Sequence, residues 1–205
     1  MTPTRALLDG ASTILGRPLS GLERGNFEKY LDILLKWQRA HRLVGSSDPV
    51  WIVEHLFLDS LLFLRVLPSS VRRLADVGSG AGVPGLPIKI VRSEVEVVLI
   101  EARRRRAMFL ASAIRAMRLE DASVVEGRLE TLGQGARGSF DAVVMRCAGD
   151  AESMLPEAAT LLRDSGMVIA SGPPRPRPLP LGEWITVPGL RAGSSRRFAV
   201  YRKKR

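Results

Sequence analysis

The sequence predicts an α/β fold in which a helical N-terminal part precedes a mainly parallel sheet that ends in an antiparallel hairpin. Three observations predict this fold. Residues 1–70 carry apolar side chains at helical spacing, residues 73–171 alternate short apolar runs with helical stretches, and two apolar runs near the C-terminus flank a Gly/Ser-rich loop. A chain of 205 residues can bury the core of one such domain with an added helical cap.

The N-terminal part has the sequence signals of helix starts and of one apolar helix face. Ser20 and Glu23 have capping-box spacing. The apolar residues that follow at helical intervals are Phe27, Tyr30, Leu31, Leu34 and Trp37. A Pro in the first turn after Asp48 opens a further helix over residues 50–67, which contains too many charges to span a membrane. We therefore expect residues 1–70 to form a helical cap and residues 71–205 to form a second domain.

From residue 73 the pattern changes to strands that alternate with helices, which implies a parallel sheet with helices on both faces. The predicted strands are 73–77, 95–101, 122–126, 140–145 and 166–171, and the predicted helices are 84–91, 103–118 and 150–162, with one turn near 129–133. The apolar runs 183–187 and 198–201 predict the closing hairpin. The proline-rich stretch 173–180 is expected to be a stiff extended connector.

The glycine-rich loop after the first strand is the segment most informative about function. Gly80, Gly82 and Gly85 match the GxGxxG pattern of dinucleotide sites, and Gly78, Gly80 and Gly82 match the GxGxG pattern of methyltransferases. Such a loop lets a ligand approach backbone N–H groups at a helix N-terminus. Glu101, at the tip of the second strand, is placed to accept hydrogen bonds from a ribose diol. The sequence therefore predicts a cofactor that contains a nucleoside.

A dinucleotide and S-adenosylmethionine both fit these glycines, and Asp76 favours the second. Its carboxylate precedes the loop, where it would attract the cationic methionine part of S-adenosylmethionine and repel a pyrophosphate. The C-terminal hairpin is also the usual ending of methyltransferases that use S-adenosylmethionine, and it is not part of the dinucleotide fold. An NADP-dependent oxidoreductase remains the alternative enzyme, and a non-catalytic RNA-binding protein is the alternative without catalysis.

Charge predicts nucleic acid as the partner. The chain has 31 basic and 21 acidic residues, a net charge of +10, and 26 of the basic residues are arginine. Arginine suits bidentate phosphate binding and stacking on bases. A GC-rich genome would explain arginine over lysine but not the excess of positive charge. The run 103–106 has three interpretations: a contact with RNA phosphates, a site for the NADP 2′-phosphate, or a solvated helical turn.

The composition indicates a cytoplasmic protein without a metal centre. Cys147 is the only cysteine, so an intrachain disulfide and a cysteine zinc site are both excluded. His41 and His55 are the only histidines. We expect no metal, no membrane span and no signal peptide.

The loop Asp76–Pro87 resembles the cofactor loop of the RsmG (formerly GidB) family, the bacterial methyltransferases of guanine N7 in 16S rRNA. The Pro-Gly-x-Pro element at residues 84–87 is the most specific part of the resemblance. Gly127-Arg128-Leu129-Glu130 and Phe140-Asp141, which lead to Arg146, also match. The resemblance covers the chain from about residue 20 to the end.

The resemblance implies a class I S-adenosylmethionine-dependent methyltransferase with a Rossmann-like sheet, acting on 16S rRNA or the small ribosomal subunit. We favour a monomer. The implied cofactor-binding residues are Asp76, Gly78, Ser79, Gly80, Val83, Glu101, Leu129, Glu130 and Arg146. Guanine N7 carries a lone pair and no proton, so its methylation needs no general base. Arg146 and Arg128 are the predicted catalytic residues because they would orient guanine through its acceptors. The alternative is that they are solvated charges at strand ends.

The sequence departs from the family pattern at several positions. Three residues separate His55 from Asp59, where the family normally has two. Ser171-Gly172 follows the fifth strand, where the family usually has Lys-Gly. One expected cation is therefore missing after the fifth strand.

Overall fold

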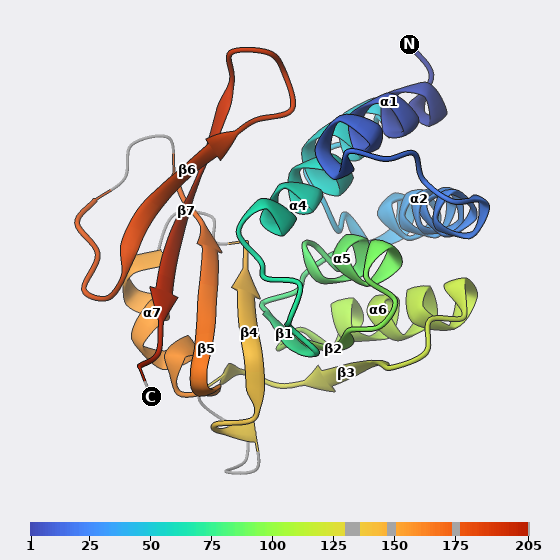
Figure 1. The fold of residues 1–205 in the computed structure, drawn as a ribbon. Helices are drawn as coiled ribbons and strands as arrows, with labels where there is room; N and C mark the ends of the chain where they lie inside the picture. The colour runs from blue at the N-terminus through green and yellow to red at the C-terminus, as the bar shows by residue number, and fades with distance from the viewer. Residues whose placement is uncertain (130–135, 147–150, 174–176, 205) are drawn as a thin grey trace.

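The computed structural model describes residues 1–129, 136–146, 151–173 and 177–204, without the side chains of residues 151 and 152. Its core is a seven-stranded sheet in the order β3-β2-β1-β4-β5-β7-β6 (Figure 1). The first five strands are parallel and β7 and β6 are antiparallel. The strand bounds are β1 Arg73–Val77, β2 Glu96–Glu101, β3 Ala122–Glu126, β4 Phe140–Met145, β5 Leu162–Ser171, β6 Glu183–Pro188 and β7 Ser195–Arg202. The predicted α/β sheet with a closing hairpin is confirmed.

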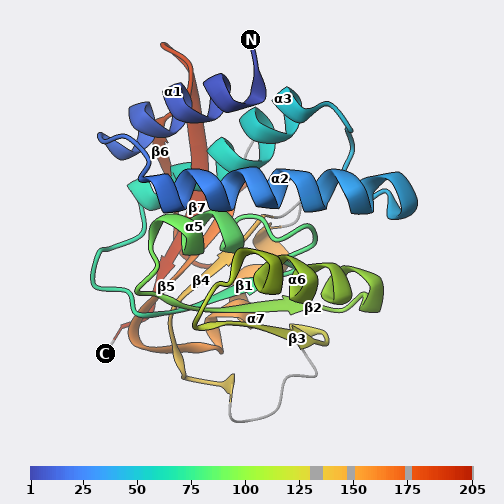
Figure 2. The ribbon, with the colours of Figure 1, turned by 90° about the vertical axis from the view of Figure 1, so that its right-hand side faces the viewer.

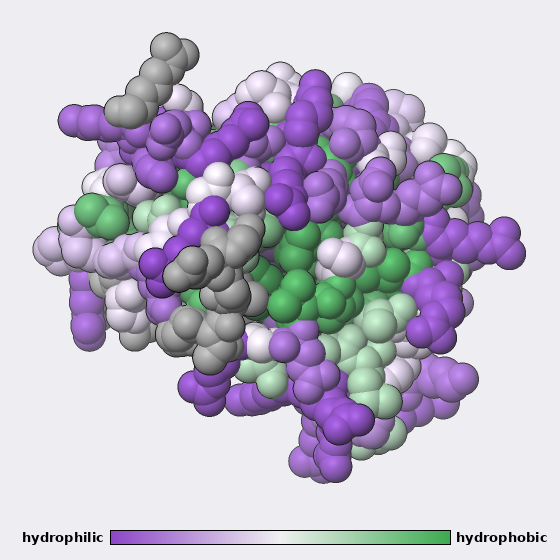
Figure 3. Space-filling view, turned by 90° about the horizontal axis from the view of Figure 1, so that it is seen from below, coloured by the Kyte–Doolittle hydropathy of each residue, from purple (hydrophilic) through white to green (hydrophobic). Residues whose placement is uncertain are grey.

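Helices cover the two faces of the sheet unequally. The helices α5 (Gly85–Val91) and α6 (Arg104–Met117) lie on one face, beneath α1 and α2 (Figure 2). The helix α7 (Ala151–Ala159) packs on the other face, against β5 and β7. Seen from below, the molecule shows an apolar area near its centre with hydrophilic side chains around it (Figure 3).

The cap begins with α1 (Pro3–Leu15) and α2 (Gly21–His41). The predicted capping box is confirmed, because Glu23 N donates to Ser20 Oγ at 3.2 Å and Ser20 N donates to Glu23 Oε2 at 2.6 Å. The helix predicted over residues 50–67 is helical but not uniform. It runs as α3 (Pro49–Ile52), the π-helical turn η1 (Val53–Leu58), α4 (Asp59–Leu61) and the 3₁₀ turn η2 (Leu62–Arg65).

The stretch from His55 to Asp59 contains a π-helical turn. A π-helix uses i→i+5 hydrogen bonds and therefore widens a helical turn by one residue. The turn η1 spans the stretch that carries one residue more than the family pattern. The apolar residues of this turn, Val53, Leu56, Phe57 and Leu58, are buried.

The cap and the sheet share one hydrophobic core. Buried side chains of α1, α2 and η1 belong to the same apolar cluster as those of α5, α6 and the strands. Tyr30 stacks on Phe57 with ring centroids 4.6 Å apart, and its hydroxyl donates to Ala81 O in the glycine loop. The cap therefore reaches the loop that was predicted to bind the cofactor.

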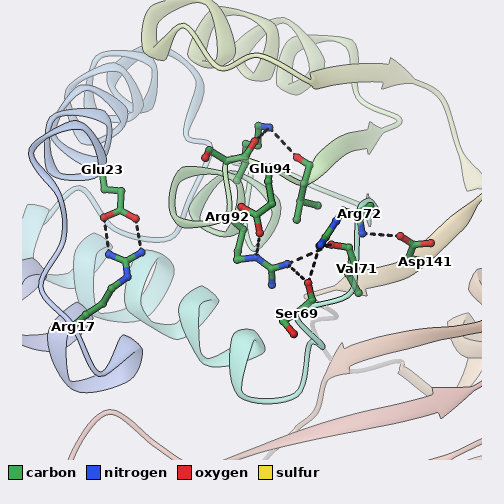
Figure 4. A network of polar contacts seen from close by, with 11 residues as sticks. Arg17, Glu23, Ser69, Val71, Arg72, Arg92, Glu94 and Asp141 are labelled. Atoms are coloured by element: carbon green, nitrogen blue, oxygen red, sulfur yellow. Dashed lines mark hydrogen bonds and ion pairs between the residues drawn. The ribbon is translucent and has the colours of Figure 1, made fainter.

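A polar network fixes the connection from η2 to β1, where the predicted domain boundary at residue 70 falls (Figure 4). Arg72 N donates to Asp141 Oδ2 at 2.6 Å, and Arg72 Nη1 donates to Ser69 O at 2.7 Å. Arg92, after α5, donates to Ser69 O at 3.0 Å. The end of the cap is thus tied to β4 and to α5.

The predicted end of the helix over residues 150–162 was wrong. The helix α7 ends at Ala159, and β5 begins at Leu162 instead of residue 166. Leu162 pairs with Phe140 of β4, and a register shift separates this pair from the rest of the ladder. Leu161 and Leu162 continue an apolar helical pattern, but they are buried in the sheet core instead. The turn predicted near 129–133 falls mostly outside the described residues, as does Cys147.

Candidate active site

The glycine loop is anchored to the end of β2 by its own backbone. Gly78 N and Ser79 N donate to Ile100 O at 2.9 and 3.1 Å, and Ser79 Oγ donates to Asp76 O at 2.8 Å. Gly78 and Gly80 have φ of +71° and +58°, values that residues with a side chain rarely adopt. A Cβ added at Gly78 would meet no atom within 4 Å. The backbone is therefore open to a ligand at this point.

The two later glycines are needed for packing. A Cβ at Gly85 would lie 2.5 Å from Leu99 Cδ2 and 2.7 Å from Asp76 Oδ2. A Cβ at Gly82 would lie 2.8 Å from the hydroxyl of Tyr30. Because neither glycine has a Cβ, α5 and the cap can pack closely against the loop and the strands. This packing holds the loop in place.

Asp76 lies beneath the loop and has no exposed surface. Its Oδ2 accepts a hydrogen bond from Gly85 N at 2.8 Å, and its Oδ1 has no hydrogen-bond partner among the described residues. Burial raises the pKa of Asp76 to about 7, against the lowering effect of the hydrogen bonds from Gly85 and Ser79, and Glu101 adds to the rise. Asp76 thus supports the start of α5, and the arrangement gives it no open face toward a ligand.

Glu101 ties the loop to the next strand and also faces a cavity. Its Oε2 accepts from Gly80 N and its Oε1 accepts from Arg103 N, both at 2.8 Å. Only 5% of the residue is exposed. The carboxylate is therefore held in a fixed orientation by backbone donors.

The cavity at the carboxyl ends of β1, β2 and β3 has a volume of about 480 Å³. Gly78 and Glu101 line one side of it, Arg128 and Leu129 line another, and Met154 of α7 contributes a third wall. Its apolar walls and single buried acid suit an adenosine, whose base would pack on Leu129 and Met154 and whose ribose would face Glu101.

The structure divides the residues predicted to bind the cofactor into two groups. Gly78, Glu101, Arg128 and Leu129 line this cavity together. The others do not line it. Asp76, Ser79 and Val83 are buried, and Gly80 is bonded through its N–H to Glu101. Arg146 lies after β4 and contacts the cap. Glu130 lies outside the described residues. The roles of all these residues remain predictions.

Arg146 extends from the end of β4 to the π-helical turn of the cap. Its Nη2 donates to His55 O at 2.5 Å and lies 3.5 Å from Asp59 Oδ2. Its Nη1 is buried, with no hydrogen-bond partner within the described residues. Burial lowers the pKa of the Arg146 guanidinium from its ordinary value, and the nearby Asp59 opposes this shift. An arginine stays charged after such a shift, so Nη1 is a desolvated donor.

Asp59 and Arg196 were not among the predicted site residues, yet they complete the surroundings of Arg146. Asp59 Oδ1 lies 3.1 Å from Arg196 Nε, and Arg196 Nη1 donates to Gly172 O at 3.4 Å. Arg196 therefore brings a cation to the end of β5, where the resemblance implied a lysine and Ser171 stands. Only one feature of the sequence pointed to Asp59, its unusual spacing from His55.

Two kinds of feature are absent from the part of the chain that the structure describes. No three His, Cys, Asp or Glu side chains there lie together in a group that could hold a metal ion. No described helix is long and apolar enough to cross a membrane.

Known proteins match this chain over most of its length. The family model for rRNA small subunit methyltransferase G matches residues 23–172. A protein of Chloroflexus aggregans named ribosomal RNA small subunit methyltransferase G is 34% identical over 82% of the chain and 71% of its own length. Proteins of the same name from Sorangium cellulosum and Methylococcus capsulatus are 36% and 32% identical, over 82% and 90% of the chain and 72% and 90% of their own lengths.

Solved structures are similar in fold at low sequence identity. A putative methyltransferase of Escherichia coli, yhhF, has a TM-score of 0.50 and 18% identity, over 70% of this chain and 81% of that one. Coclaurine N-methyltransferase, solved with N-methylheliamine and S-adenosylhomocysteine (SAH), has a TM-score of 0.53 and 16% identity, over 70% and 42%. The sheet is thus the Rossmann-like sheet of class I methyltransferases.

Proposed function

We propose that this protein, which belongs to the rRNA small subunit methyltransferase G family, transfers a methyl group from S-adenosylmethionine to N7 of a guanine in 16S rRNA. It is an rRNA methyltransferase by family, and the choice of atom and cofactor is the part proposed here. The observation that carries the proposal is Glu101, a buried acid that faces the cavity from the end of β2.

The residues of the cavity fit a nucleoside cofactor. A Cβ at Gly78 would stand in open space, so the present glycine leaves room for a ligand against the backbone. Glu101 would accept hydrogen bonds from the ribose hydroxyls, and Leu129 and Met154 would cover the adenine. When bound, S-adenosylmethionine supplies an electrophilic methyl group on a sulfonium.

The arginines suit a reaction that needs orientation and no proton transfer. Guanine N7 has a free lone pair, and guanine O6 beside it accepts hydrogen bonds. Arg146 Nη1 is a buried donor with no hydrogen-bond partner among the described residues, which supports a contact with O6. Arg128 lines the cavity and is therefore nearer the cofactor half of the site.

Positive charge next to the cavity supports an RNA substrate. Arg103, Arg104 and Arg105 are exposed at the start of α6, directly after Glu101. Phosphate contacts of such side chains would release counterions, so the affinity for 16S rRNA should fall steeply with salt. An NADP-dependent oxidoreductase fits less well, because NADP sites usually lack the acid that Glu101 provides.

Single-turnover methyl transfer tests the proposal. The protein is incubated with methyl-labelled S-adenosylmethionine and either 16S rRNA or small subunits from cells that lack this enzyme, and the RNA is digested to nucleosides. We expect the label in 7-methylguanosine. Label in another nucleoside would refute the choice of N7. Absence of transfer, together with tight binding of NADP(H), would refute the methyltransferase assignment.

A further inference from the structure

Three segments that are far apart in the sequence meet at one charged group, which we call the Asp59 corner: Asp59, Arg146 and Arg196. Asp59 is the first residue of α4, directly after η1, Arg146 follows β4, and Arg196 belongs to β7. Both arginines approach the same carboxylate, at 3.5 Å and 3.1 Å. The side chains of all three are only 18–26% exposed.

The π-helical turn gives the corner its acceptors. Asp59 N donates to Leu56 O, three residues back, whereas a regular α-helix would use His55 O, four residues back. His55 O accepts a hydrogen bond from Arg146 Nη2. The turn therefore presents a backbone carbonyl and a carboxylate to the same guanidinium, and Arg146 is left with Nη1 as its unused buried donor.

The corner also balances charge where the proposed reaction creates it. Methylation at N7 leaves a positively charged purine, and two neighbouring guanidinium groups would oppose that charge. At low exposure such interactions are poorly screened by salt. One carboxylate between the two arginines leaves the group with a single net positive charge, while Arg146 keeps its hydrogen-bond donors.

We propose that Asp59 is a positioning residue for the methyl transfer, which holds Arg146 toward the guanine and offsets the charge of Arg196. This inference rests on the proposed function. It assigns to Asp59 no contact with the substrate: its effect passes through the two arginines. Removal of the carboxylate should therefore slow the reaction and leave the binding of the cofactor and of the rRNA nearly unchanged.

A matched control lies on the same two parts of the fold. Glu54, in η1, pairs with Arg191 of the β6–β7 loop at 3.2 Å, and its side chain is 18% exposed, as that of Asp59 is. This pair joins the cap to the hairpin without involving Arg146. Asp59→Asn and Glu54→Gln thus each remove one equally buried carboxylate that pairs the cap with the hairpin, and only the first of them faces Arg146.

The experiment compares single-turnover rates, half-saturating rRNA concentrations and SAH affinities of wild type, Asp59→Asn and Glu54→Gln. We expect Asp59→Asn to lower the rate about tenfold to a hundredfold, with both affinities within about twofold of wild type. Glu54→Gln should match wild type. The single-turnover rate of Asp59→Glu, which keeps the charge, should lie between those of wild type and Asp59→Asn. This variant keeps the test available if Asp59→Asn folds poorly.

Two further measurements separate positioning from simple support of the fold. In Asp59→Asn/Arg196→Gln the surplus cation is removed with the anion, so the double variant should be faster than Asp59→Asn. Nitrogen-15 spectra of the arginine guanidinium groups should show restricted rotation of Arg146 in wild type and Glu54→Gln, and faster rotation in Asp59→Asn. Equal rates for Asp59→Asn and Glu54→Gln, or additive losses in the double variant, would overturn the positioning role. A wild-type protein without methyl transfer would overturn the proposed function itself.

Discussion

The cofactor cavity and the Asp59 corner lie at the same end of the sheet but are built in different ways. On the cavity side, the glycine loop, Glu101 and Arg103 hold one another through backbone N–H groups, and the hydrogen bonds of Glu101 span 21 and 2 residues. The corner is made from side chains of α4, of the residue after β4 and of β7, and its contacts span 91 and 137 residues. One region depends on backbone conformation, and the other depends on charges brought together by packing.

This difference predicts separate consequences of mutation. A change in the glycine loop or at Glu101 should alter cofactor affinity, because these groups face the nucleoside site. A change at Arg146 or Asp59 should alter the rate of methyl transfer, because these groups lie on the proposed side of the base. Variants that affect both quantities equally would erase the distinction.

The largest expected effect is at Gly80, whose φ of +58° is strained for any β-branched residue. Gly80→Val should reduce the affinity for SAH more than about a hundredfold, because the loop must change conformation to relieve the strain. Gly16→Val is the matched control: Gly16 also has a positive φ, +68°, and open space around it, but it ends α1. Calorimetric titration should find wild-type affinity for SAH in Gly16→Val, although its melting temperature falls about as much as that of Gly80→Val. Equal affinity of the two variants would contradict the role given to the loop.

The pH dependence of stability tests the buried position of Asp76. Its pKa is about 7 in the folded protein and about 3.9 in an unfolded chain, so the folded state retains the proton over a range where the unfolded state has lost it. This contribution to the free energy of unfolding is complete below pH 4 and is lost as the pH rises through 7, a change of about 4 kcal/mol. Asp76→Asn lacks the titrating group. Between pH 4 and pH 8, the free energy of unfolding measured in urea should therefore fall in wild type relative to Asp76→Asn. An equal pH dependence of the two proteins would contradict the raised pKa of Asp76.

Arg146 should dominate the rate of the reaction. Arg146→Ala should slow methyl transfer about tenfold to a thousandfold, the usual cost of one positioned donor. Lysine should restore little activity, since it lacks the planar fork that bonds His55 O and faces Asp59 at once. Single-turnover assays of Arg146→Ala and Arg146→Lys measure this, with Arg24→Ala, an exposed arginine of α2, as the control. An unchanged rate in Arg146→Ala would reduce Arg146 to a structural cross-link.

The two regions also differ in how far the sequence predicts them. The loop and Glu101 were predictable because glycine spacing and strand ends are local patterns, and parallel strands bring their carboxyl ends together. The roles of Asp59 and Arg196 were not predictable, because their contacts with each other and with Arg146 depend on how the cap and the hairpin pack on β4. The extra residue after His55 was visible in the sequence, but its π-helical form follows from burial of the apolar residues around it. Leu161 and Leu162 misled the prediction because an apolar pair fits a helix or a strand equally well.

The affinity for SAH of Glu101→Ala and Arg146→Ala, measured side by side by calorimetry, tests most directly whether the site has two separable halves. Glu101→Ala should weaken binding about 5- to 150-fold, because ribose hydroxyls would be left unpaired at a cost of about 1–3 kcal/mol. Arg146→Ala should bind SAH within about twofold of wild type, because the cavity that Glu101 faces is lined by other residues. Normal affinity in Glu101→Ala, or an equal loss in Arg146→Ala, would contradict the account.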